Sequence, residues 1–82
     1  MRIVVLTSGF VFVCKSMDMQ EGHITLHNAR CVQKWGTDKG LGQLVSGPTK
    51  ETVLQALIPL VTAPKASLVF FFDVSSNWEK HL

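Results

Sequence analysis

The residues best suited to bind a ligand lie close together in the middle of the chain. Trp35 is followed by the glycine-rich stretch Gly36-Thr37-Asp38-Lys39-Gly40-Leu41-Gly42. Glycines allow backbone N–H groups to converge on one point, and a following helix N-terminus adds partial positive charge, so such a stretch could hold a small anion. Thr37 adds a hydroxyl, Lys39 adds a charge, and Trp35 offers a flat face on which a nucleobase could stack.

Basic residues surround this stretch. Four of them lie between positions 30 and 50 against one acid, Asp38, so the local charge of +3 exceeds the +2 of the whole chain. The stretch matches neither a Walker A loop nor a G-x-G-x-x-G loop. We expect an anion-binding site formed by Arg30, Trp35, Gly36, Thr37, Lys39, Gly40, Thr49 and Lys50. The alternative is that Trp35 covers the core and the glycines only form turns.

The sequence gives no sign of catalysis or of a resident metal. The six acidic residues offer no pair of carboxylates whose spacing would serve one substrate. No motif links Cys14 or Cys31 to a histidine as nucleophile and base. On a strand, His23 and His27 would lie on one face about 13 Å apart, too far to share a metal ion. We therefore expect a non-enzymatic protein without a cofactor, with both cysteines free inside apolar runs.

Apolar, β-branched runs predict the strands that position this site. They cover residues 3–6, 10–13, 23–32 and 67–74, with Ser8-Gly9 forming a turn or a bulge between the first two. Gln20-Glu21-Gly22 is typical of a hairpin turn. Asn28 and Arg30 interrupt one face of the third run, and mark either a ligand-facing patch or the rim of the sheet.

The remaining segments predict short helices and connections. The spacing of Leu41, Leu44 and Val45 predicts a short helix at about residues 39–46, which Gly47-Pro48 ends. Residues 49–57 fit either a helix or a short strand from Thr52 to Leu57. Pro59 and Pro64 make residues 58–65 a connecting segment in either case. Ser76 and Glu79 form a capping-box pattern that predicts a C-terminal helical stub.

Together these elements predict a mainly β protein with a single domain over residues 1–82. We expect a small antiparallel barrel or sandwich of four to six strands, because a sheet this small must curl or pack on a second sheet to bury its faces. Charged residues are only 17 % of the chain, below the roughly 25 % of ordinary domains. Three successive phenylalanines, Phe70 to Phe72, place apolar side chains on both faces of the last strand. We therefore expect a homo-oligomer in which a second subunit covers one of them.

The composition also bears on where the protein acts. No apolar run reaches the ~18 residues of a membrane span. The apolar beginning, Ile3 to Val13, lacks the small-residue cleavage site of a secretory peptide. Two cysteines are too few for a disulfide scaffold. We expect a cytoplasmic protein that does not bind membranes.

Three segments resemble a known family: Asn28-Ala29-Arg30-Cys31, Trp35-Gly36-Thr37-x-Lys39-Gly40-Leu41-Gly42-x-Leu44 and Gly47-Pro48-Thr49. The family contains small phage, prophage and gut-bacterial proteins that have no established enzymatic activity. The chain departs from the family pattern at Asp38, where a threonine is usual, and at Val74-Ser75-Ser76, where acids are usual. The resemblance implies a mostly β fold and favours a strand at residues 52–57. By analogy with other small phage proteins, it implies a counter-defence role in the host cytoplasm.

Three functions fit these features. The leading hypothesis is a protein that sequesters a cyclic oligonucleotide or related nucleotide second messenger without turnover, with Arg30 and Lys39 pairing with phosphates. The second is an inhibitor or assembly module that binds a host protein, with Trp35 and Phe70 to Phe72 as aromatic anchors. The third is a binder of single-stranded nucleic acid. It is disfavoured because the chain has no tyrosine and only one aromatic residue in its basic stretch.

Overall fold

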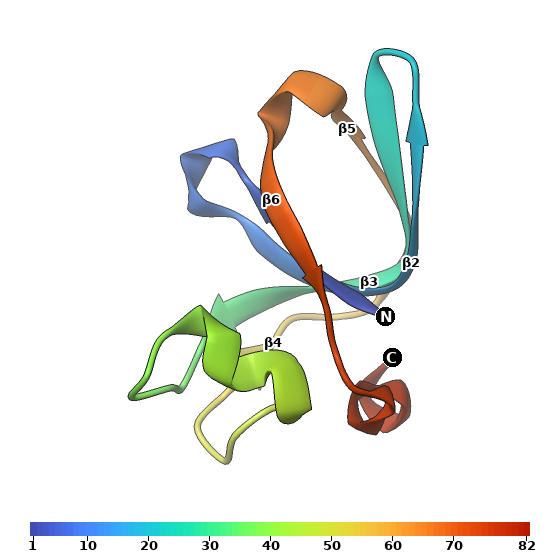
Figure 1. Ribbon diagram of the computed structural model, residues 1–82. Helices are drawn as coiled ribbons and strands as arrows, with labels where there is room; N and C mark the ends of the chain where they lie inside the picture. The colour runs from blue at the N-terminus through green and yellow to red at the C-terminus, as the bar shows by residue number, and fades with distance from the viewer.

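Two hairpins that share one strand form the frame of the molecule. The computed structural model describes residues 1–82 and contains six strands in one antiparallel sheet, with four short 3-10 helices (Figure 1). In chain order the elements are β1 (Arg2–Leu6), η1 (Thr7–Gly9), β2 (Val11–Gln20), β3 (His23–Lys34), η2 (Leu41–Ser46), β4 (Val53–Leu54), β5 (Ile58–Pro64), η3 (Lys65–Ser67), β6 (Leu68–Asp73) and η4 (Ser76–His81).

Tight turns close both hairpins where the sequence predicts them. The first turn places Ser8 and Gly9 at φ values of 71° and 81°, so the first two apolar runs are separate strands. The second is a two-residue turn of Glu21 and Gly22 between Gln20 and His23, which face each other across the hairpin. Gly22 has a φ of 86°, a conformation that glycine adopts without steric cost.

Strands β2 and β3 bend sharply together, and this bend converts the sheet into a barrel. Cys14 and Met17 on β2 belong to one cluster of buried side chains inside the molecule, and Ala29 and Leu26, which lie opposite them on β3, belong to the same cluster. Residues three apart on a flat strand point to opposite faces. Each strand must therefore bend and twist between these two residues, so that both side chains point to the interior. Asn28 has a φ of 50°, which marks the bend on β3. The two halves of the hairpin therefore belong to different walls of one small barrel (Figure 1).

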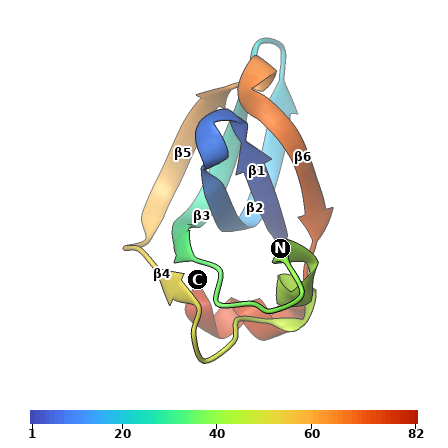
Figure 2. The same cartoon turned by 90° about the vertical axis from the view of Figure 1, so that its left-hand side faces the viewer.

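The barrel stays open on one side. The strands follow the order β6-β1-β2-β3, and β3 pairs with β5 through its first half and with β4 at its end. Helix η3 joins β5 to β6, but no hydrogen-bonded pairing connects these two strands. Figure 2 shows β5 and β6 on opposite sides of the β1–β2 hairpin. Both strands are therefore free edges of the sheet.

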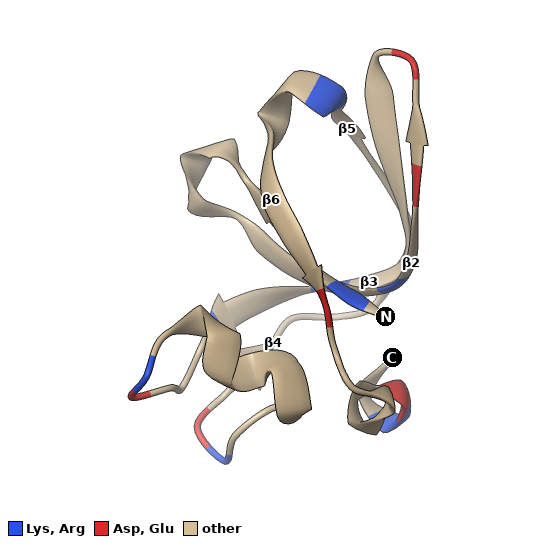
Figure 3. Ribbon diagram, in the orientation of Figure 1, with Lys and Arg blue, Asp and Glu red and all other residues tan.

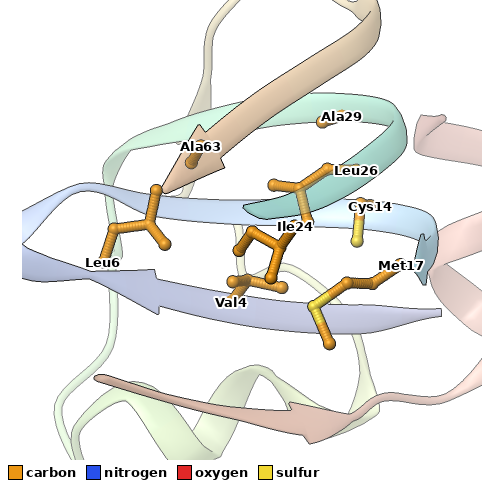
Figure 4. Close-up of a cluster of buried hydrophobic side chains, with 8 residues drawn as sticks. All are labelled: Val4, Leu6, Cys14, Met17, Ile24, Leu26, Ala29 and Ala63. Carbon is orange, nitrogen blue, oxygen red and sulfur yellow. The ribbon is translucent and has the colours of Figure 1, made fainter. Parts of the chain in front are cut away.

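Apolar side chains form two clusters, one inside the barrel and one on the outer face of the sheet. Figure 4 shows the interior cluster, in which side chains from β1, β2, β3 and β5 point toward one another: Val4, Leu6, Cys14, Met17, Ile24, Leu26, Ala29 and Ala63. The second cluster packs η2 and η4 against the other face of the sheet and comprises Ile3, Val11, Val13, Val32, Leu44 and Trp78. The two helices are too short to be stable by themselves, and burial of Leu44 and Trp78 stabilises them.

The structure confirms the mainly β fold, the short helix near residues 39–46 and the C-terminal helical stub. Two predictions were wrong. Residues 58–65, expected as a connection, contain β5, because Pro59 and Pro64 lie on an edge strand where a missing N–H is tolerated. The cap of η4 is Ser75, whose hydroxyl accepts a 3.1 Å hydrogen bond from the Asn77 N–H, and not Ser76.

The ambiguous residues 49–57 form neither a helix nor a full strand. Only Val53 and Leu54 pair with β3, and a turn precedes them. Both cysteines are free; Cys14 is buried and Cys31 is half-buried. No helix of the structure is long and apolar enough to span a membrane.

Candidate functional site

The loop after β3 is held in place by a turn from a distant part of the chain. The Thr49 hydroxyl donates a 2.6 Å hydrogen bond to the Gly36 carbonyl, and the Thr52 hydroxyl donates a 2.7 Å bond to the Trp35 carbonyl. Gly36 has a φ of 69°, and a Cβ at this position would lie 2.3 Å from the Glu51 carbonyl carbon. The close approach of the two segments therefore requires glycine.

Both hydroxyl groups of the turn also accept hydrogen bonds from N–H groups of the turn itself. The Thr49 N–H donates to the Thr52 hydroxyl at 2.9 Å, and the Glu51 N–H donates to the Thr49 hydroxyl at 3.1 Å. The Thr49 hydroxyl thus already donates one hydrogen bond and accepts another. Its position in the predicted site is real, but its role in this structure is to join the loop to the turn.

Backbone N–H groups do converge in the glycine-rich loop. Those of Asp38 and Lys39 both donate to the side-chain oxygen of Gln43, at 3.2 and 3.0 Å. A single acceptor therefore occupies the point at which the sequence predicts an anion. Gln43 was not among the site residues predicted from the sequence. The signal for it was an amide side chain in the first turn of the helix that follows the loop.

Arg30 lies away from this loop and ties together two other segments. Its Nε donates to the Gln55 carbonyl at 2.7 Å, and its Nη1 donates to the His81 carbonyl at 3.1 Å. The residue is half-buried and links β3 to the segment before β5 and to η4. The structure therefore does not bring Arg30 to the predicted site, and gives its guanidinium a bracing role.

A hollow of about 530 Å³ lies between the loop and the turn. It is lined by Lys34, Gly36, Thr37, Asp38, Gln43, Thr49, Lys50 and Glu51. Two lysines face two carboxylates here, and the Lys34 ammonium lies 4.0 Å from the Glu51 carboxylate. Gly36, Thr37, Thr49 and Lys50 of the predicted site are brought together, whereas Arg30, Trp35, Lys39 and Gly40 are not in the lining.

A second hollow of about 520 Å³ adjoins the first and carries more positive charge. It shares Thr49 and Lys50 with the first hollow, and its lining adds Lys80 and His81 without any carboxylate residue. Figure 3 shows Lys and Arg on the loops and on η4 at one end of the molecule, with Asp or Glu close to them. Lys80 and His81 were not among the predicted site residues, because the capping pattern of the last helix concerns only its first turn.

The tryptophans have opposite environments. Trp35 has 41 % of its surface exposed, so it is not a cover of the core. Trp78 is completely buried, and its indole N–H donates a 2.7 Å hydrogen bond to the Leu44 carbonyl. Trp35 is therefore partly accessible to a partner, whereas Trp78 is not.

The titratable groups give little support for covalent chemistry. Burial raises the pKa of the Cys14 thiol to about 11, and it also raises that of Cys31. A protonated thiol is a poor nucleophile at neutral pH. His27 forms a 2.8 Å pair with Asp18 at the surface, and no group of three or more potential metal ligands occurs.

A further exposed feature lies on the two free edges of the sheet. We call these side chains the open-edge residues: Ile58, Leu60, Val69, Phe70 and Phe71. Leu60 and Val69 are 57 % and 55 % exposed, and Phe70 is 49 % exposed. The prediction that both faces of the last strand are covered is therefore not met within one copy of the chain.

Comparison of the chain with protein-family models, with curated protein sequences and with solved structures gave no match. The resemblance to small phage proteins thus stays a prediction from the sequence.

Proposed function

We propose that the protein is a non-enzymatic binding module that acts through contact with another protein chain. The observation that carries this proposal is the exposure of the open-edge residues on β5 and β6. Isolated apolar residues are common on protein surfaces, but large ones gathered on unpaired edge strands are typical of interaction sites.

The exposed apolar area of these side chains is large enough for its burial to contribute substantially to binding free energy. A phenylalanine buries 150–250 Å² when fully covered, so Phe70 at 49 % exposure still offers roughly 100 Å². Covering that area contributes about 2.5 kcal/mol at ~25 cal/mol per Å². A few anchors of this size are sufficient for most of the binding energy of a protein interface.

A matched set of lysine substitutions tests the proposal. Leu60→Lys and Phe70→Lys change one open-edge residue on each strand, and Val53→Lys changes an equally apolar residue on β4 that is 41 % exposed. Each immobilised variant, shown to be folded by circular dichroism, is incubated with lysate of the producing cells. We expect proteins retained by the native chain and by Val53→Lys to be lost with the open-edge variants. Retention that is equal for all variants would contradict the proposal, and so would a native chain that retains no protein and is also monomeric at every concentration.

Sequestration of a nucleotide second messenger is the second candidate function. It is favoured by the meeting of Gly36, Thr37, Thr49 and Lys50 at one hollow, close to an exposed Trp35. The counter-defence role implied by the phage resemblance would belong to either function. The balance of two lysines by Asp38 and Glu51 in that hollow, and the use of Arg30 elsewhere, place it second.

Thermal unfolding with cyclic di- and trinucleotides tests this second function. A ligand at 100 times its dissociation constant should add about 2.7 kcal/mol to the free energy of unfolding. The shift should decrease in Lys50→Ala and Trp35→Ala and persist in Lys15→Ala, which changes a lysine on β2 outside both hollows. A shift that is unchanged in all three variants would refute the assignment of the site.

A further inference from the structure

We propose that a second copy of this chain occupies the free edge of β6, paired antiparallel to it about a two-fold axis at Phe71. This inference rests on the proposed function, because it names the partner of the open-edge residues. It begins from the topology: β6 pairs with β1 on one side, and none of its residues has a backbone hydrogen-bond partner on the other. Such an edge presents alternate N–H and C=O groups to an incoming strand.

The two free edges differ in how well they are protected. Strand β5 contains Pro59 and Pro64, and proline discourages the addition of a strand because it has no N–H to donate. Strand β6 contains no proline and no lysine. Of the two edges, β6 is the one able to accept a further strand.

The charge of the β6 edge favours a second copy over a charged partner. In a two-fold dimer, a charged side chain near the axis lies close to the same charge on the second copy, and the two repel each other. Residues 68–72 carry no charge, and the Asp73 carboxylate forms a 3.2 Å ion pair with the Arg2 guanidinium of the same chain. Arg2 also lies over the Phe71 ring, 5.1 Å from its centroid. Two such edges can therefore approach without net repulsion.

The faces of the strand fix the register of the pair. In antiparallel strands related by a two-fold axis normal to the sheet, opposite residues must share a face, so the axis must lie midway between the two copies of one residue. The pairing of β1 with β6 shifts between Phe70 and Leu68, so regular pairing extends from Phe70 to Asp73. An axis at Phe71 places Phe70 opposite Phe72 of the second copy. The 6.2 Å stack of Phe70 on Phe72 would then continue into a cluster of four rings.

The available area predicts a dimer that dissociates on dilution. Stable interfaces bury about 800 Å² per partner, whereas the whole surface of this chain is 4853 Å². Val69, Phe70 and Phe71 together expose on the order of 300 Å² of side chain. The edge therefore supports self-association that depends on concentration, with backbone hydrogen bonds supplementing the apolar contact.

Sedimentation and disulfide cross-linking test the inference together. Native protein in a dilution series from about 1 mM to ~1 μM should pass from dimer to monomer. Phe70→Lys should raise the dissociation constant at least tenfold, and Val53→Lys should leave it unchanged. In a Cys31→Ser background, Phe71→Cys should form a disulfide dimer, because directly opposite Cα atoms lie within about 5.5 Å. Val69→Cys should not, because its two copies would be about 13 Å apart.

Each alternative outcome has a definite meaning. Native protein that is monomeric at every concentration, or a dimer unaffected by Phe70→Lys, would overturn the inference. Cross-linking by Val69→Cys as efficient as that by Phe71→Cys would overturn the register. A monomeric native protein whose capture of other proteins still depends on Phe70 would overturn this inference alone. Capture of other proteins that is unaffected by both Phe70→Lys and Leu60→Lys would instead overturn the proposed function.

Discussion

The buried indole of Trp78 donates a 2.7 Å hydrogen bond to the Leu44 carbonyl, 34 residues earlier in the chain. Both side chains are completely buried in the same cluster. This contact joins η4 to η2, and it therefore fixes the two helices that border the hollows. It is one of several contacts that bring the C-terminal part of the chain to the loop region, together with the hydrogen bonds from Asn77 to Ser46 and from Arg30 to His81.

Replacement of Trp78 should separate the packing of this pair from its hydrogen bond. Trp78→Phe keeps most of the apolar volume and leaves the Leu44 carbonyl unpaired, which should cost about 1–3 kcal/mol of unfolding free energy. Trp78→Ala also creates a cavity and should cost about 3–5 kcal/mol. Chemical denaturation of both variants measures the difference. Equal losses would show that the packing lost beyond phenylalanine contributes little and that the hydrogen bond accounts for most of the loss.

The close approach at Gly36 makes a second prediction. Gly36→Ala would place a Cβ 2.3 Å from the Glu51 carbonyl carbon, at a φ of 69°. We expect a loss of more than about 2 kcal/mol, together with displacement of the turn from Thr49 to Thr52. Gly42→Ala is the matched control, because nothing lies within 4 Å of its Cβ position. It should be neutral or stabilise by up to ~1 kcal/mol, and a similar effect of both substitutions would contradict the proposed clamp.

Cys14 predicts how stability changes in alkaline solution. Its pKa is raised from 9.0 to about 11 by burial, so the folded state keeps the thiol proton that the unfolded state loses. The folded state then binds more protons than the unfolded state, and stability falls as the pH rises from about 9 to 11. Cys14→Ala should remove this part of the pH dependence. Denaturation of both proteins between pH 8 and 11 is the measurement, and identical slopes would contradict the assignment to Cys14.

The sequence predicts the strands of this fold better than their ends and edges. Alternation at Ile24 and Leu26 is a local signal, and it correctly places β3. Strand β5 was missed because Pro59 and Pro64 disfavour a strand locally, whereas its pairing with β3 is a tertiary contact. The hairpin bend at Asn28 also has no local signature that separates it from a rim of polar residues.

In the candidate site, too, the sequence predicts local features but not contacts between distant residues. Glycine spacing correctly indicates convergent N–H groups, since those of Asp38 and Lys39 do point to one place. The partners of Arg30 lie 25 and 51 residues away along the chain, so no local pattern could assign its hydrogen bonds. The burial of Trp78 and the exposure of Trp35 likewise depend on distant residues rather than on their neighbours.

The role of Gln43 in the loop can be tested by two opposite substitutions. Its side-chain oxygen accepts hydrogen bonds from Asp38 and Lys39 at 3.2 and 3.0 Å. Gln43→Ala leaves both N–H groups to water, which should cost less than about 1 kcal/mol because the loop is exposed. Their hydrogen exchange should nevertheless become faster. Gln43→Glu places a carboxylate on the same two donors, which should form stronger charge-assisted bonds and slow their exchange.

The same pair of variants shows whether the converging N–H groups can hold an external anion. If they can, inorganic phosphate should slow exchange at Asp38 and Lys39 in Gln43→Ala, because it takes the place of the missing oxygen. Phosphate should have no such effect in Gln43→Glu, in which the position is filled and negatively charged. The stronger bonds of the carboxylate should also weaken at low pH as it becomes protonated. Phosphate protection that is equal in both variants would place the anion elsewhere, and the Lys50, Lys80 and His81 hollow would be the next position to examine.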